Sequence, residues 1–240
     1  MKANLGRARF VHRKSSNLSK DFNTMTEQEF IDQATRFAEN ETRFDLTAFP
    51  CLNDDAGHGY DQHYIYHVAW ALRKIKEINP RNHIDIGSSL HLSTCAAAIV
   101  PTTFYDFRAP KISVPNLMVA QYDLTKHALS PVESVSCCHV VEHIGLGRYG
   151  DNLDNEGDLK AIANLKKIAN KHLLFVVPVG RPVVAFNAHR VYSPVYIRNL
   201  FSEYDCDFFL IPNDGRDPFT TKVTELDLPY ACGCFHFIKK

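Results

Sequence analysis

From residue 83 onward, short apolar runs alternate with amphipathic segments, and this alternation limits the fold more strictly than any other feature of the chain. His83–Ile86 is a short apolar run that ends in Gly87-Ser88-Ser89, and residues 90–99 after it have helical spacing. Parallel strands need crossover connections, which are usually helices, so alternating strands and helices predict a sheet with helices on both faces. We therefore predict the α/β class with a doubly wound sheet.

The remaining segments extend this pattern to about seven strands. The predicted strands after the first are residues 102–107, 117–122, 134–140, 172–179, 206–211 and 231–238, and the later helices are residues 157–170 and 193–204.

The first part of the chain has a different character. Residues 1–25 are polar, and residues 26–39 predict a helix because Thr26 and Glu29 form a capping-box pattern ahead of apolar residues at helical spacing. A loop is expected at 51–59 and a helix at 60–78. We predict two regions: a partly helical N-terminal extension over residues 1–56, and the α/β domain over residues 57–240.

Composition excludes several classes of protein. Lys+Arg and Asp+Glu number 27 each, so the formal net charge is zero, which argues against a nucleic-acid-binding coat or a polybasic membrane anchor. No apolar run is long enough to span a bilayer, and residues 1–20 lack the apolar core of a signal peptide. Seven cysteines without a Cys-x-x-Cys pair indicate reduced, mostly structural thiols. We expect a cytoplasmic location.

Small and acidic residues lie at the ends of three successive predicted strands. In a doubly wound sheet, ligands bind beyond the carboxyl ends of the strands. Gly87 allows close approach of a ligand to the backbone, and the start of the next helix offers free N–H groups. Asp106 suits a ribose diol, and Asp123 suits the exocyclic amine of an adenine. These residues predict a nucleoside-containing cofactor.

The order of these segments resembles a known superfamily. The segments DIGSS (85–89), FYD (104–106), YDL (122–124), CHVVEH (138–143) and LLFVVPVG (173–180) are similar to class I S-adenosylmethionine-dependent methyltransferases. HVVEHIGLGRYGD (139–151) and NAHRVYS (187–193) resemble a poorly characterised bacterial branch. Its members often accompany glycosyltransferases in surface-polysaccharide gene clusters. The resemblance spans residues 57–213 and implies a Rossmann-like methyltransferase sheet.

The resemblance also implies roles for individual residues. Asp85 and Gly87 match the turn that holds the methionine part of S-adenosylmethionine, and Asp106 matches the acid that binds ribose. The family's Gly-x-Gly turn is here Gly87-Ser88-Ser89, and its Gly-Gly before the fifth strand is replaced by Asn170-Lys171. The expected cofactor-binding residues are Asp85, Gly87, Ser88, Asp106, Asp123, Leu124 and, from a helix that covers the cofactor, His63.

Polar residues gather after the fourth and fifth predicted strands. His139-Val-Val-Glu142-His143 matches an inverted zinc-peptidase motif, but that motif needs a helix, and here a strand precedes it and glycines follow. Three interpretations stay open for this cluster: a general base, a metal site, or a structural brace of the strand exit. The candidate bases are His143, His189 and His139. The candidate ligands for Mn, Fe, Mg or Zn are Glu142, His143, Asp151 and His189.

The sequence thus predicts an S-adenosylmethionine-dependent O-methyltransferase. The expected acceptor is a small-molecule sugar hydroxyl, either nucleotide-linked or part of a capsule or surface polysaccharide. One alternative is a non-catalytic scaffold or regulatory subunit that retains the fold. Another is an enzyme with a nicotinamide cofactor, against which the missing G-x-G-x-x-G turn counts. The oligomeric state and the acceptor stay open.

Overall fold

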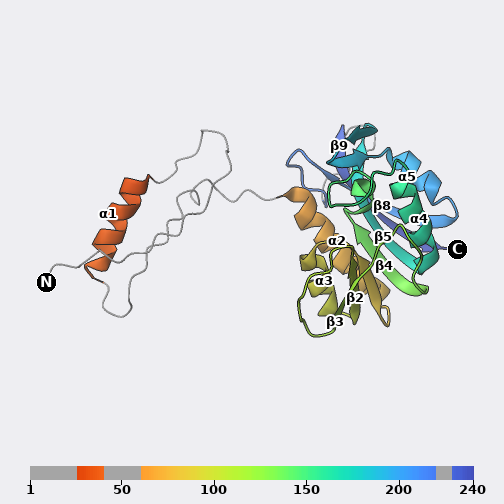
Figure 1. Cartoon of the computed structure of the whole chain (residues 1–240), viewed down its shortest axis with the longest axis horizontal. Helices are drawn as coiled ribbons and strands as arrows, with labels where there is room; N and C mark the ends of the chain where they lie inside the picture. Colours follow the sequence, from red (N-terminus) through yellow and green to blue (C-terminus); the bar gives the residue numbers. More distant parts are fainter. Residues whose placement is uncertain (1–25, 41–60, 220–228) are drawn as a thin grey trace. The chain divides into compact units, whose positions relative to one another are not determined.

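A computed structural model describes residues 26–40, 61–219 and 229–240 (Figure 1). The chain divides into two units, Met1–Tyr60 and Asp61–Lys240. In the first unit, α1 spans Glu27–Ala38, and Thr26 and Glu29 form the predicted capping box. The predicted lead-in, the loop at 51–59 and the domain boundary after residue 56 lie outside the described residues, and that boundary stays a prediction.

The second unit contains a seven-stranded sheet in the order β3-β2-β1-β4-β5-β9-β8. The five strands from β3 to β5 run parallel, and β9 runs antiparallel to both β5 and β8. Every predicted strand is confirmed, with bounds shifted by a few residues. The bounds are β1 His83–Ile86, β2 Thr102–Asp106, β3 Leu117–Gln121, β4 Val132–Cys138, β5 Ala169–Gly180, β8 Tyr204–Pro212 and β9 Tyr230–Lys239.

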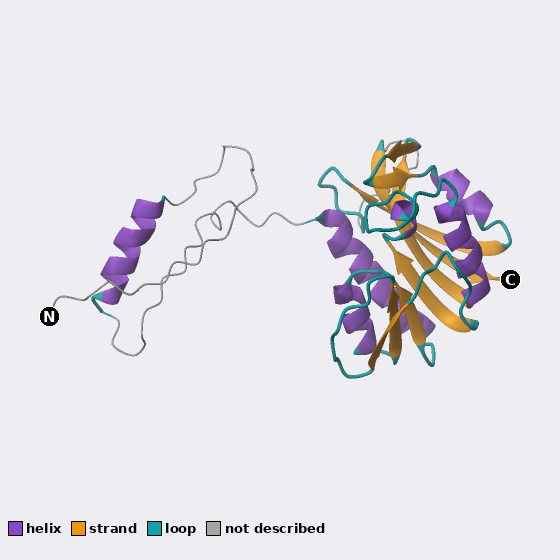
Figure 2. Cartoon of the chain, viewed as in Figure 1, coloured by secondary structure: helices purple, strands orange, loops and turns teal. Residues whose placement is uncertain are grey.

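Helices cover both faces of this sheet (Figure 2). One apolar core lies under α2 and α3, with Trp70 and Leu92 at its centre, and the other lies under α4 and α5, with Leu165 and Ile197. The helix bounds are α2 Gln62–Ile78, α3 Leu90–Ala97, α4 Gly157–Ile168 and α5 Pro194–Leu200. The predicted doubly wound α/β class is therefore confirmed. No described helix combines the length and the apolar character that crossing a membrane requires.

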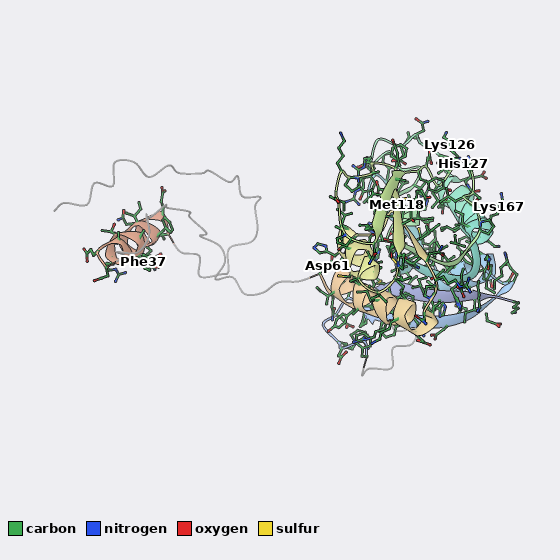
Figure 3. All side chains as sticks on the ribbon, turned by 90° about the horizontal axis from the view of Figure 1, so that it is seen from below. Phe37, Asp61, Met118, Lys126, His127 and Lys167 are labelled. Atoms are coloured by element: carbon green, nitrogen blue, oxygen red, sulfur yellow. The ribbon has the colours of Figure 1, made fainter. Side chains whose placement is uncertain are left out.

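β5 shows why the sequence specifies an apolar core on each face of the sheet. Leu173 and Phe175 belong to one core, whereas Leu174 and Val176 belong to the other, because successive side chains of a strand point to opposite faces. A strand buried on both faces has a continuous apolar sequence rather than an alternating one. By contrast, Met118 on the edge strand β3 is 62% exposed (Figure 3).

The predicted strand at 134–140 ends two residues early, at Cys138. His139 has φ of 57°, which leaves the extended region and stops the strand. A short 3-10 helix at Val141–His143 follows. The hairpin of β6 (Val183–Ala185) and β7 (His189–Val191) was not predicted, because strands of three residues carry too little periodicity.

Candidate active site

A cavity of about 740 Å³ opens at the carboxyl edge of the parallel strands. It is lined by residues that follow β1, β2, β3 and β4, together with Tyr64 from α2. This is the edge at which an open α/β sheet binds ligands, and the volume lies within the range of small-molecule and cofactor sites. Five predicted cofactor-binding residues share this lining: Gly87, Ser88, Asp106, Asp123 and Leu124.

The turn after β1 is built closely around Gly87. Its φ is +66°, and an added Cβ would meet the side chain of Val140 at 3.1 Å. Ser88 Oγ accepts a hydrogen bond of 3.0 Å from the Cys138 N–H, and Ser89 caps α3 by accepting from the Leu92 N–H at 3.3 Å. The Ser88 hydroxyl therefore holds the turn to the end of β4, and the Ser89 hydroxyl holds it to the start of α3.

Asp85 lies beneath this turn rather than on the cavity surface. It is fully buried, and its carboxylate accepts hydrogen bonds from the hydroxyls of Ser136, at 2.5 Å, and Ser93. Burial raises the pKa of Asp85 to about 6, although these hydroxyls act in the opposite direction. Asp85 is not among the residues that line the cavity. In this structure it connects β1, β4 and α3.

The acids at the ends of β2 and β3 do reach the cavity. Asp106 Oδ1 accepts a hydrogen bond of 2.6 Å from the Arg108 N–H, and Asp123 Oδ1 accepts from both the N–H and the hydroxyl of Thr125. Each carboxylate is thus oriented through one oxygen by its own loop. This arrangement holds two acceptors for donor groups, such as hydroxyls or an amine, at the ends of neighbouring strands.

His143 lines the same cavity. Its Nδ1 lies 2.6 Å from the Ala188 carbonyl oxygen, which can only accept, so Nδ1 carries the proton. In the neutral ring, Nε2 then has a free lone pair. Glu142 Oε1 is 3.8 Å from this Nε2 and would stabilise the ring once it is protonated. The geometry is suited to a general base.

His139 also lines the cavity but is engaged at both ring nitrogens. Nδ1 is 2.8 Å from Glu142 Oε1, and Nε2 is 3.5 Å from Cys232 Sγ. Burial opposes charge on His139, but Cys232 and Glu142 raise its pKa to about 10. Burial also opposes a thiolate at Cys232, but Cys234 and His139 lower the pKa of Cys232 to about 6. Sequence reasoning assigned Cys232 only a packing role.

His63 and His189 lie outside the cavity lining. His63 is buried on α2, with its ring stacked on Tyr230 at 5.5 Å and 6.3 Å from the ring of His139. The ring of His189 is 6.3 Å from that of His143, and burial lowers the pKa of His189.

Asp151 shapes the loop after β4. Its carboxylate accepts hydrogen bonds from the N–H groups of Gly145, Gly147 and Tyr149 at 2.7, 3.4 and 3.2 Å. In the described part of the chain, no three of the predicted metal ligands Glu142, His143, Asp151 and His189 bring their ligand atoms together.

Comparisons with known proteins agree with the architecture. The family model described as "Caenorhabditis protein of unknown function, DUF268" matches residues 107–225. A comparison with curated proteins gave no match.

Solved structures with a similar fold include several methyltransferases. A putative methyltransferase from Thermobifida fusca is 10% identical, with 74% of this chain and 81% of that chain covered and a TM-score of 0.51. The methyltransferase domain of bacterial CtHen1-C is 13% identical over 74% and 100% of the two chains, with a TM-score of 0.52. Magnesium protoporphyrin IX methyltransferase from Synechocystis, solved with bound S-adenosylmethionine, is 15% identical over 78% and 89%, with a TM-score of 0.50. At these identities the likeness shows the fold, which is that of Rossmann-like methyltransferases.

Proposed function

We propose that this chain is an S-adenosylmethionine-dependent methyltransferase. The observation that carries the proposal is one cavity in which the Gly87 turn, Asp106 and Asp123 lie at the carboxyl ends of three neighbouring strands. Gly87 has no side chain to keep a ligand away from its backbone, and a Cβ there would meet Val140 at 3.1 Å. The start of α3 adds backbone N–H donors, and the two carboxylates accept from hydroxyls and amines. The residues present therefore fit the cofactor.

We assign a partner in this cavity to each part of the cofactor. Asp106 would accept hydrogen bonds from the ribose hydroxyls, Asp123 would accept from the adenine amine, and Gly87 would lie against the methionine part. Asp85 would act from below as a positioning residue, through Ser93 and Ser136. When bound, the cofactor supplies a methyl group on a cationic sulfonium, whose sulfur leaves as a neutral thioether.

We place the acceptor beside His143 and propose that it is a sugar hydroxyl. Nε2 of His143 would take the hydroxyl proton while the Ala188 carbonyl holds Nδ1–H, and Glu142 would stabilise the resulting charge. His139 is less suited to this role because both its nitrogens are engaged. The polar wall of His143, Tyr149 and Asp151 suits a polyol, and the bacterial branch that the sequence resembles favours a nucleotide-linked or polysaccharide sugar. Such an acceptor is consistent with a cytoplasmic enzyme.

Calorimetric titration with S-adenosylmethionine tests the cofactor. We expect micromolar binding to the intact chain, and about tenfold weaker binding for Asp106→Asn, or about 1.4 kcal/mol, because one acceptor of the ribose hydroxyls is lost. The matched control is Asp205→Asn, an exposed carboxylate on β8 that pairs with Lys240.

Two results would refute the assignment. Equal affinities of Asp106→Asn and the intact chain would remove the acid at the end of β2 from the cofactor site. A folded, cofactor-free sample that binds nothing at millimolar ligand would favour the non-catalytic scaffold. That alternative drew its support from the Gly87-Ser88-Ser89 departure, and the structure now gives both serines a part in holding the turn.

A further inference from the structure

Beside His139 lies a group of buried polar atoms that have no hydrogen-bond partner. His63 is 6% exposed, His67 is fully buried and Glu142 is 1% exposed. His63 Nε2, His67 Nε2 and Glu142 Oε2 have no hydrogen-bond partner. Buried polar atoms in native proteins are nearly always satisfied, so three orphaned atoms in one neighbourhood need an explanation.

The geometry around this group matches a metal ion. One ring nitrogen each of His63 and His139 and the sulfur of Cys232 lie within 4.8 Å of one another. His139 Nε2 and Cys232 Sγ are 3.5 Å apart. With zinc–nitrogen bonds of about 2.0–2.1 Å and zinc–sulfur bonds of about 2.3 Å, a tetrahedral site places nitrogen and sulfur ligands about 3.5 Å apart.

The supporting hydrogen bonds orient the rings as ligands. His139 Nδ1 faces Glu142 Oε1 at 2.8 Å, and metal-bound histidines usually donate their second N–H to a carboxylate or carbonyl. His67 Nδ1 donates to the His63 carbonyl at 2.6 Å, which leaves a lone pair on the orphaned Nε2. His67 follows His63 by one helical turn, and its ring is 5.0 Å from that of His139.

Charge favours the same conclusion. Within the described residues, Glu142 forms ion pairs only with His139 and His143, so without a metal the His139 ring is the one group that faces both Glu142 and Cys232. A divalent ion would balance the Glu142 carboxylate and a Cys232 thiolate together. Two imidazoles and a thiolate suit zinc, which is borderline-soft, better than magnesium or calcium.

We propose that His63, His139 and Cys232 bind a zinc ion, with His67 as the additional nitrogen donor and Glu142 as the carboxylate that orients His139. The ligands come from α2, the exit of β4 and β9, so the ion fastens the helix to the sheet beside the cavity. This site differs from the metal ligands that the sequence suggested. It also stands independently of methyl transfer.

Metal content of the full chain is the direct test. Protein stripped with a chelator and desalted is loaded with zinc sulfate, desalted again and analysed for zinc. We expect about one zinc per chain. Cys232→Ser and His139→Gln should lose this zinc, whereas Cys206→Ser, which alters an exposed thiol on β8, should retain it. Glu142→Gln should weaken zinc binding about 10–100-fold, and the partly exposed Glu133→Gln should not change it.

Two measurements on the unaltered chain keep the test decisive if a variant does not fold. Cobalt in place of zinc should give a thiolate-to-cobalt charge-transfer band, and zinc should protect Cys232 from iodoacetamide. Failure to retain zinc, absence of that band, or equal loss in Cys206→Ser would overturn the proposal. Alkylation of Cys232 at the same rate with and without zinc would instead identify a thiolate–imidazolium pair with His139.

Discussion

His83 lies at the start of a buried polar chain that ends beneath the Gly87 turn. Its Nδ1 and Nε2 are each 2.9 Å from a hydroxyl, of Ser134 and Ser136 respectively. Ser136 uses its own hydrogen on Asp85, so it can only accept from His83. His83 Nε2 therefore carries the proton, and Nδ1 accepts from Ser134. This neutral form satisfies every partner.

Protonation of His83 should therefore be costly, and its cost can be measured as pH dependence. Burial lowers the pKa of His83 from 6.5 to about 3. Between these values the unfolded chain binds a proton that the folded chain does not, so the free energy of unfolding falls as pH drops below 6.5. Linkage over one group gives a loss of about 2 kcal/mol between pH 7 and pH 5.

Urea unfolding of the intact chain and of His83→Gln at the two pH values isolates this effect. His83→Gln should have a lower free energy of unfolding than the intact chain at both pH values. The decrease in that free energy from pH 7 to pH 5 should, however, be smaller in the variant by about 2 kcal/mol. Asp85, whose pKa is raised to about 6, gains a proton on folding and acts in the opposite direction. It is present in both proteins and cancels to first order. His127→Gln, an exposed residue (Figure 3), is the control. Equal losses in the intact chain and in His83→Gln would refute the reasoning.

Three further predictions concern the cavity. His143→Gln should lower turnover about 10²–10⁴-fold with an unchanged cofactor dissociation constant, measured as product formation on a panel of nucleotide sugars; full activity would exclude His143 as the base. Gly87→Ala should lower the free energy of unfolding in urea more than Gly215→Ala does. Both glycines have positive φ, but only at Gly87 would the added Cβ crowd Val140. Equal decreases in the two variants would contradict a steric role for Val140. Ser89→Ala should cost about 1 kcal/mol of stability by removing the cap of α3, and no change would show that the cap is dispensable.

Local patterns were enough to predict the strands of the main sheet and the shared edge of the cavity. Gly87, Asp106 and Asp123 could be placed together because parallel strands end at one edge of a sheet, whatever their side chains contact. The hairpin of β6 and β7 was missed, although it carries the Ala188 carbonyl that fixes the tautomer of His143. Strands of three residues give no readable period.

The cluster behind His139 depends on information that no local pattern holds. Cys232 lies opposite Pro178 through the antiparallel register of β9 and β5, and a shift of one residue would turn its thiol to the other face. His63 and His67 arrive from α2, far away in the sequence. Asp85 was predicted to contact the cofactor, whereas β1 alternation turns it away from the face of Ile84 and Ile86 and toward Ser93.

The position of β9 has a consequence for the order of assembly during synthesis. β9 follows β8 in the chain but lies between β5 and β8 in the sheet, so β8 has no place to dock until β9 has left the ribosome. The parallel strands from β1 to β5 can assemble earlier, with the edge of β5 open to wrong pairing in the meantime. Cys232 is also on β9. The nascent chain could therefore form the cavity at the carboxyl edge before it could capture the proposed zinc ion. A stall in translation before residue 230 would leave an incomplete sheet with a hydrophobic edge for chaperones to cover.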